Sequence, residues 1–205
     1  MIKSNPNNPY AARQTIGYFI GFFTLGSVIA SLGVTLPGLA DHLSAGLDDM
    51  GLLFTFRSFG YLLGSLLCGW LIDRFTGHRV LVMYFILAAI ILSLIPQIPT
   101  LALTILGFFI VGLTQSGIDV GTNTMLPRVH GERSAPYLNA LFFFAGLGGF
   151  ITPIVLQRIQ NTSFGLTGAY LVIAILAIPP AIWLIFTPTP KEDETSHDGG
   201  GNDFK

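Results

Sequence analysis

Three polar side chains recur at four-residue spacing inside one long apolar stretch of the sequence. Gln115, Asp119 and Asn123 lie within residues 100–125, where Asp119 is the only charged residue. Because an α-helix has about 3.6 residues per turn, this spacing puts all three side chains on one helix face. A carboxylate surrounded by hydrocarbon needs a partner, an ion or water, so Asp119 is a candidate for binding a proton or a cation.

Four hydroxyl side chains share one face of an earlier apolar stretch, residues 15–38. They are Thr24, Ser27, Ser31 and Thr35, at positions i, i+3, i+7 and i+11. Two interpretations stay open for this face. It lines a polar cavity together with the Asp119 face, or it packs helix against helix, as small hydroxyl residues commonly do in membranes. We expect the shared cavity and include these residues in the candidate binding site.

Two more polar residues interrupt apolar stretches, Arg57 within residues 50–72 and Asn139 within residues 136–157. Each also has a structural interpretation: Arg57 extends outward to the bilayer surface or bonds loop carbonyls, and Asn139 hydrogen-bonds a helix end. At about 1.5 Å of rise per residue, Arg57 and Asp119 differ in depth by roughly 15 Å. We therefore expect no direct ion pair between them.

These residues need long apolar helices to position them, and the composition supplies them. Charged residues make up 10% of the chain, against about 25% in soluble domains, and apolar residues make up 51%. Between short charged islands lie apolar runs of about 20 residues, long enough to cross a hydrocarbon core of roughly 30 Å as helices. The predicted spans are residues 15–38, 50–72, 80–96, 100–125, 136–157 and 167–187. The third and sixth spans carry few polar residues, so we expect them to be peripheral and lipid-facing.

Several classes of protein are excluded. A net charge of −1 gives no sign of nucleic-acid binding, and the single cysteine, Cys68, excludes a disulfide framework. No metal cluster, phosphate loop or redox motif is present, so we expect no cofactor. An intramembrane serine protease would need a histidine on a span, whereas His42, His78, His130 and His197 fall in predicted loops or the tail. We therefore expect a protein that is not an enzyme.

The basic residues set the expected orientation. One side of the predicted bundle carries eight of them and the other carries only Arg158. The eight are Lys3, Arg13, Arg74, Arg79, Arg128, Arg133, Lys191 and Lys205. Because Lys and Arg accumulate in cytoplasmic loops, we expect both termini in the cytoplasm of a protein of the cell or inner membrane.

The two halves of the chain resemble each other. Residues 53–56 are followed by Gly60 and Gly64, and residues 141–144 are followed by Gly146 and Gly149. A Thr-containing segment ending in proline also closes both the first and the fourth span. Three helices followed by three similar helices have opposite topology, and inverted 3+3 repeats are typical of transporter folds.

The loop between the second and third spans carries the most specific motif. Residues 69–79, Gly-Trp-Leu-Ile-Asp-Arg-Phe-Thr-Gly-His-Arg, resemble the signature loop of the major facilitator superfamily. An extra residue, Thr76, precedes the glycine, and one of the two usual basic residues is missing. The resemblance implies a gating role for Gly69, Asp73, Arg74, Gly77 and Arg79.

Two further segments are similar to the branch of this superfamily that contains sodium-dependent glucose transporters and fucose and glucose permeases. They are residues 30–39 with 52–73, and residues 117–124 with 129–141. The resemblance covers residues 15–187 and implies that Asp119 takes part in sugar binding and cation coupling, with Na⁺ or H⁺ as the ion.

The resemblance matches only the N-terminal half of a twelve-helix transporter. We therefore expect a half-size secondary transporter for a small polar solute, a monosaccharide, that works as a homodimer or with a second half. The alternative is a truncated or regulatory membrane subunit that keeps the fold and transports nothing. The expected fold class is all-α membrane protein, six spans with a 3+3 inverted repeat. Residues 1–14 form an N-terminal segment, residues 15–187 the membrane domain, and residues 188–205 a disordered tail.

Overall fold

The apolar runs are helical throughout the computed structural model, which describes residues 9–190. No β-strand occurs in that range, so the predicted all-α fold class is confirmed. The elements are α1 (Ala11–Leu43), α2 (Leu47–Arg74), α3 (Gly77–Leu94), η1 (Ile95–Gln97), α4 (Leu101–His130), η2 (Gly131–Arg133), α5 (Ser134–Gln160), α6 (Gly165–Leu176) and α7 (Ile178–Ile185). The predicted N-terminal segment (1–14) and disordered tail (188–205) lie largely outside the described residues.

Five continuous helical stretches in the described chain are long and apolar enough to cross a membrane. One of them, Leu101–Gln160, has 60 residues, which would measure about 90 Å as a single rod. It contains two helices, α4 and α5, because the chain turns back at Gly131, where φ is 57°. The six predicted spans therefore correspond to α1, α2, α3, α4, α5 and the pair α6–α7.

Proline does not end the helices where the sequence suggested. α1 continues through Pro37 to Leu43, and α4 continues through Pro127 to His130, so both helices are longer than the predicted spans, residues 15–38 and 100–125. Helix-breaking residues are tolerated in membrane helices because neighbouring groups satisfy the freed backbone atoms. The helices consequently extend past the apolar runs that identified them.

The last span is interrupted between α6 and α7, at Ala177, just before Pro179 and Pro180. Pro180 has no N–H to donate to the carbonyl of Leu176 four residues earlier. The Thr24 hydroxyl of α1 donates to that carbonyl instead, at 3.0 Å. A hydroxyl of the first helix thus stabilises the break in the last one.

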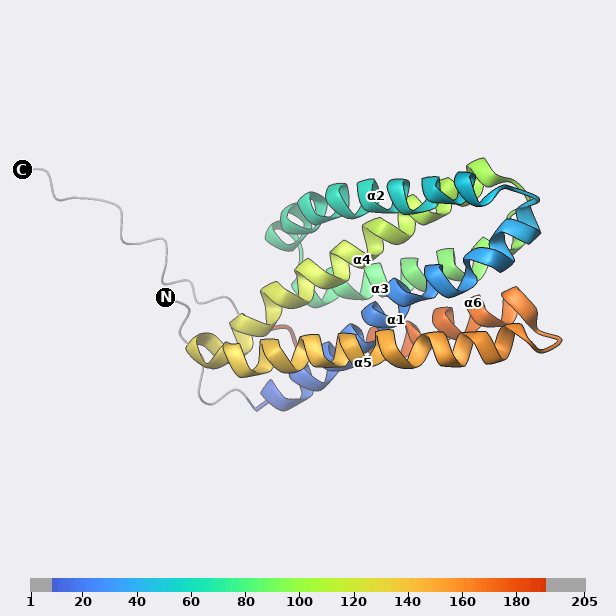
Figure 1. Ribbon diagram of the computed structural model, residues 1–205. Coiled ribbons are helices and arrows are strands. Elements are labelled where there is room, and N and C mark those ends of the chain that lie inside the picture. The colour runs from blue at the N-terminus through green and yellow to red at the C-terminus, as the bar shows by residue number, and fades with distance from the viewer. Residues whose placement is uncertain (1–8, 191–205) are drawn as a thin grey trace, which may run out of the picture.

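The two three-helix repeats exchange partners when they pack. α2 lies along α4 and α1 lies along α5, whereas α1 and α2 touch only slightly (Figure 1). The α2–α4 crossing becomes the α1–α5 crossing when α1 is exchanged with α4, α2 with α5, and α3 with α6–α7. The packing therefore has the pseudo-twofold symmetry expected of an inverted repeat.

Both crossings are formed by glycines that press against the opposing backbone. A Cβ atom on any of the four would overlap a carbonyl group of the other helix, and each carbonyl lies three residues before the opposing glycine. The glycine and carbonyl pairs are Gly26 with Ala145, Gly148 with Phe23, Gly60 with Phe109, and Gly112 with Arg57. Gly26 and Gly112 stand 86 positions apart and Gly60 and Gly148 stand 88 apart, so the repeat seen in the sequence extends to the contacts.

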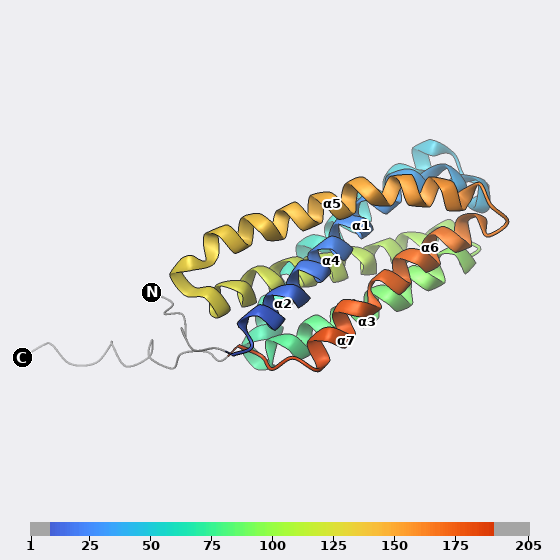
Figure 2. The same cartoon turned by 90° about the horizontal axis from the view of Figure 1, so that it is seen from below.

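The remaining helices cover one side of this arrangement. α3 packs against α4, α6 and α7, and Figure 2 shows these C-terminal helices beside α3. Their outer faces carry exposed apolar residues such as Ile86, Ile90, Ile175 and Ile182. These faces fit the predicted lipid-facing position of the third and sixth spans.

Candidate functional site

Polar side chains form a ladder with two levels between α2 and α4. At the first level Arg57 Nε donates to Gln115 Oε1 at 2.8 Å. At the second level, one helical turn further on both helices, the Tyr61 hydroxyl donates to Asp119 Oδ2. Asn123, one more turn along α4, donates to Asp119 Oδ1 at 2.7 Å. Four of the predicted site residues, Gln115, Asp119, Asn123 and Arg57, therefore lie on two successive levels of this ladder, Arg57 with Gln115 on one and Asp119 with Asn123 on the other.

The Asp119 carboxylate is half-buried and held by neutral donors. One oxygen accepts from Tyr61 and the other from Asn123, while Arg57 donates to Gln115 and to the carbonyl of Ile29 at 3.5 Å. The carboxyl group thus has partners that can hydrogen-bond to both its charged and its neutral form, because a phenol and an amide both donate and accept. Such a group suits reversible binding of a proton or a cation.

Arg57 also determines which way the Gln115 amide points. A guanidinium has only donors, so the Gln115 oxygen must face Arg57 and the NH₂ group must point elsewhere. That NH₂ group is buried and has no hydrogen-bond partner among the described residues. A buried unpaired donor is expensive, on the order of 1–3 kcal/mol, and such groups gather at functional sites.

An open groove lies beside the first level of the ladder. It has a volume of about 320 Å³, at the lower end of the range usual for small-molecule sites, and α1, α2 and α4 contribute its walls. The lining residues are Ile29, Phe54, Arg57, Ser58, Tyr61 and Gln115. Two aromatic rings with hydroxyl, amide and guanidinium groups suit a small solute that has both apolar and polar faces.

Phe54, Ser58 and Tyr61 were missing from the predicted site. Each lies three or four residues from Arg57 or from another of the three on α2, so the helical period around Arg57 was the signal that could have found them. Tyr61 lies inside the predicted apolar span 50–72, and its hydroxyl contacts Asp119.

The hydroxyl face of α1 does not line a cavity, and that prediction is wrong. Thr24, Ser27, Ser31 and Thr35 are all buried, with exposed fractions of 2% or less. Each hydroxyl donates to a carbonyl of α1 itself, three or four residues back. Thr24 and Thr35 also bond α6, through the carbonyl of Leu176 and the hydroxyl of Tyr170. The face packs α1 against α5 and α6, which is the alternative that the sequence left open.

Asn139 lies apart from the ladder. It is exposed in the first half of α5 and does not line the groove. The structure therefore does not bring it together with Asp119.

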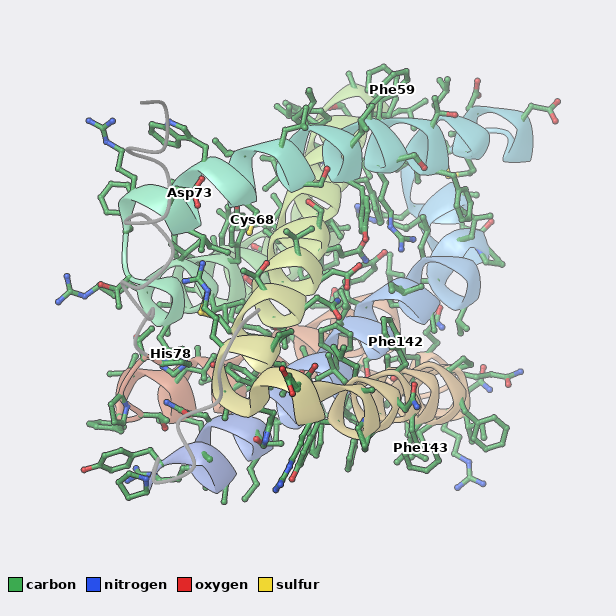
Figure 3. All side chains as sticks on the ribbon, turned by 90° about the vertical axis from the view of Figure 1, so that its left-hand side faces the viewer. Phe59, Cys68, Asp73, His78, Phe142 and Phe143 are labelled. Carbon is green, nitrogen blue, oxygen red and sulfur yellow. The ribbon has the colours of Figure 1, made fainter. Side chains whose placement is uncertain are left out.

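The motif at residues 69–79 joins α2 to α3 at the end of the bundle where α1 begins and α7 ends, here called the terminal end. Asp73, Arg74 and Arg79 are exposed, and the Arg74 guanidinium lies 5.8 Å from the centre of the Trp70 ring. A Cβ on Gly69 would meet open space, whereas one on Gly77 would overlap Met125 of α4. Gly77 thus fixes the approach of α3 to α4, and the exposed Asp73 lies near the end of α2 (Figure 3).

Two histidines assigned to loops belong to the packed terminal end. His78, in the first turn of α3, is 3% exposed and bridges the Tyr18 hydroxyl at 2.7 Å and the carbonyl of Thr187 at 2.8 Å. Since the carbonyl only accepts, His78 Nδ1 carries a proton. His130, at the end of α4, contacts the Thr15 hydroxyl at 2.7 Å. Their assignment to loops is wrong because both helices extend past the apolar runs.

No group of three or more His, Cys, Asp or Glu residues within residues 9–190 could hold a metal ion. The polar groups of the ladder and its groove are one carboxylate, one guanidinium, two amides, a phenol and a hydroxyl.

Comparison with known proteins identifies the family. The family model described as Major Facilitator Superfamily matches residues 18–202. Sodium-dependent glucose transporter 1A of Mus musculus is 29% identical over 145 residues, which cover 71% of this chain and 34% of that protein. Sodium-dependent glucose transporter 1 of Rattus norvegicus is 31% identical over 142 residues, 69% of this chain and 29% of that protein. Major facilitator superfamily domain-containing protein 4A of Xenopus tropicalis is 30% identical over 146 residues, 70% and 29% respectively. The chain thus spans about a third of the length of the relatives it matches.

Proposed function

This chain belongs to the major facilitator superfamily, and on that premise we propose that it forms one six-helix wall of a secondary transporter for a small polar solute. It is an integral, multi-pass membrane protein of a transporter family rather than an enzyme. The observation that carries the proposal is the ladder of Arg57, Tyr61, Gln115 and Asp119 beside an open groove. Charged and polar residues inside a membrane domain are expensive, and where they occur they commonly mark a path for a solute or an ion.

The solute class that we propose is a monosaccharide. Sugars have hydroxyl groups that donate and accept, and C–H faces that stack on aromatic rings. The groove offers Phe54 and Tyr61 as ring surfaces, and Ser58 and Gln115 as polar partners. The relatives named sodium-dependent glucose transporters support the same class.

We propose that Asp119 binds the coupling ion, which is Na⁺ or H⁺. Support comes from the half-buried carboxylate and from its two neutral partners, Tyr61 and Asn123. Binding of a cation would replace or reorient these partners. Tyr61 also lines the groove, so a reorientation of its side chain on cation binding would directly change the surface that contacts the solute.

The groove is open, so transport needs a second wall, and we propose that a second six-helix unit supplies it. That unit is either a second copy of this chain, related by a twofold axis along the membrane normal, or a different half of the same fold. In the twofold arrangement the exposed Asp73 would face the start of α5, near residues 134–137, where a carboxylate suits the helix dipole. The motif of Gly69, Asp73, Arg74, Gly77 and Arg79 would then control opening at the terminal end.

We propose that the terminal end faces the cytoplasm, with the chain in the cell or inner membrane. The excess of Lys and Arg on this side supports the orientation. Arg74, Arg79, Arg128 and Arg133 all lie at the terminal end, whereas Arg158 lies near the opposite end of α5.

Uptake by proteoliposomes tests the function. The purified chain is reconstituted and given labelled D-glucose and L-fucose under a Na⁺ gradient or a proton gradient, each against vesicles without a gradient. We expect accumulation of one sugar under one gradient only. Cross-linking in the same vesicles reports whether a dimer forms. Vesicles that contain the cross-linked dimer yet accumulate neither sugar would favour the non-transporting subunit.

A further inference from the structure

A polar cavity lies at the terminal end, away from the ladder. It is bounded by the start of α3, the end of α7 and the residues that follow α7, and its volume is about 390 Å³. Among its lining residues are Thr76, Arg79, Val82 and Thr189. His78, labelled in Figure 3 where α3 meets α7, also borders this cavity but is already engaged with Tyr18 and Thr187.

An apolar groove continues from this cavity along the outer face of α3. Its volume is about 470 Å³, and it shares Arg79 and Val82 with the polar cavity. The other lining residues are Met83, Ile86, Leu87 and Ile90. The two spaces thus form one continuous surface with a polar end and an apolar run.

The length of the apolar run matches one leaflet of a bilayer. Arg79 and Ile90 are eleven residues apart on one helix, which corresponds to about 16 Å of rise. Half of a hydrocarbon core of roughly 30 Å is about 15 Å. A groove that begins at the end of a span and has this length reaches from the membrane surface to the bilayer centre.

The charge at the polar end selects the kind of occupant. Arg79 is the only Lys, Arg, Asp or Glu residue lining either space, and within residues 9–190 its guanidinium has no hydrogen-bond or ion-pair partner. Nearby, Asp73 and Arg74 at the end of α2 are both exposed and offset each other. A guanidinium at the membrane surface that has no partner among residues 9–190, in a cavity that Thr76 and Thr189 also line, suits a phosphate group.

We propose that this surface binds one anionic glycerophospholipid, with its phosphate at Arg79 and one acyl chain along α3 as far as Ile90. The site is separate from the transport ladder and does not depend on transport activity. A cytoplasmic terminal end, as proposed above, would place it in the leaflet where anionic lipids are concentrated.

Native mass spectrometry of the purified full chain tests the proposal. The chain is incubated in detergent with equal amounts of phosphatidylglycerol and phosphatidylcholine of the same acyl chains. We expect about fivefold more bound phosphatidylglycerol, the ratio that one basic residue near the membrane surface provides. Arg79→Gln is expected to bring the two lipids to within about twofold of each other, whereas Arg79→Lys keeps most of the preference.

Arg133→Gln is the matched control, because it removes the same charge from an exposed position at the same end of the bundle. It should leave the lipid preference unchanged. Ile86→Trp should fill the apolar groove and reduce retention of both lipids, while circular dichroism checks that each variant stays folded. Equal binding of the two lipids by the unmodified chain, or an equal loss of preference in Arg79→Gln and Arg133→Gln, would overturn the proposal.

Discussion

The two crossings of this bundle, α1 with α5 and α2 with α4, have the same backbone contacts and different side chains. Each is formed by two glycines pressed against carbonyls of the opposing helix. At α1 with α5 the polar residues are small hydroxyls, fully buried and bonded to backbone. At α2 with α4 they are Arg57, Tyr61, Gln115 and Asp119, bonded to one another beside an open groove.

Because Gly26 and Gly112 are 86 positions apart, residues of α1 can be compared with the residues of α4 that lie 86 positions later. This offset relates Ile29 to Gln115 and Gly33 to Asp119, so the first repeat has an apolar side chain and no side chain where the second has an amide and a carboxylate. The glycine contacts therefore set the scaffold, and the proposed function rests on a few polar residues on one of the two equivalent surfaces.

The largest loss of stability is expected when a methyl group is added to a glycine at one of the crossings. Gly26→Ala and Gly112→Ala each place a Cβ atom on a carbonyl group of the opposing backbone, which cannot move aside as a side chain can. We expect both variants to lose about 3 kcal/mol of stability, the upper part of the range for overpacking, and to do so equally. Thermal unfolding in detergent measures this. A large loss in one variant and none in the other would show that the two crossings are not equivalent scaffolds.

Asp119→Asn is expected to abolish accumulation of solute under a cation gradient and to leave the fold intact. The amide keeps one oxygen for Asn123 and can bond the Tyr61 hydroxyl with its NH₂ group, but it cannot bind a proton or neutralise a cation. Melting should change by no more than about 4 °C, which corresponds to about 1 kcal/mol in a chain of this size. Gradient-driven uptake equal to that of the unmodified chain would remove Asp119 from the coupling step.

One substitution in each crossing should separate uptake from stability: the first lowers uptake and the second lowers stability. Gln115→Met removes a buried unpaired NH₂ group, which stabilises, and the oxygen that accepts from Arg57, which destabilises by a similar amount, so we expect little change in melting and at least about a tenfold loss of uptake. Thr24→Val removes the hydroxyl that bonds Leu176, so we expect a loss of about 1 kcal/mol of stability and unchanged uptake by the folded fraction. Uptake and melting of both variants, measured side by side, check the contrast. Loss of uptake in folded Thr24→Val would restore the α1 face to the binding site.

The smallest effect is expected at Gly33, the position related to Asp119. A Cβ atom there meets no heavy atom within 4 Å, and alanine is a better helix former than glycine by up to about 1 kcal/mol. Gly33→Ala should therefore raise the melting temperature slightly without changing uptake. Destabilisation comparable to that of Gly26→Ala would show that α1 is packed differently from the structure described.

Much of the scaffold could be predicted from the sequence because hydrophobic length and glycine spacing are local signals. The six apolar runs, the echo of residues 53–56 in residues 141–144 and the polar face of Gln115, Asp119 and Asn123 all have counterparts in the structure. Leu53 and Leu141, at the start of the two echoed segments, are both fully buried.

The composition of the site was predicted less well, for two physical reasons. A serine or threonine that bonds its own helix has the same spacing whether its outer side meets water or another helix, so Thr24 to Thr35 could be assigned either way. Tyr61 was overlooked because a tyrosine in an apolar run resembles packing, and only the neighbouring helix shows what its hydroxyl contacts. Polar residues past the ends of the apolar runs, such as His78, were assigned to loops because a helix can continue beyond the hydrocarbon.

The exchange of partners between the repeats also constrains how the chain is made. A ribosome delivers α1, α2 and α3 to the membrane before α4 exists, and in the folded state these three helices touch one another only slightly. The glycine face of α2 therefore remains in contact with lipid or with the insertion machinery until α4 has been inserted. The same holds for α1, whose main partner is α5, the second helix of the next repeat. The first repeat therefore cannot complete its packing during synthesis until α4 and α5 of the second repeat have been inserted.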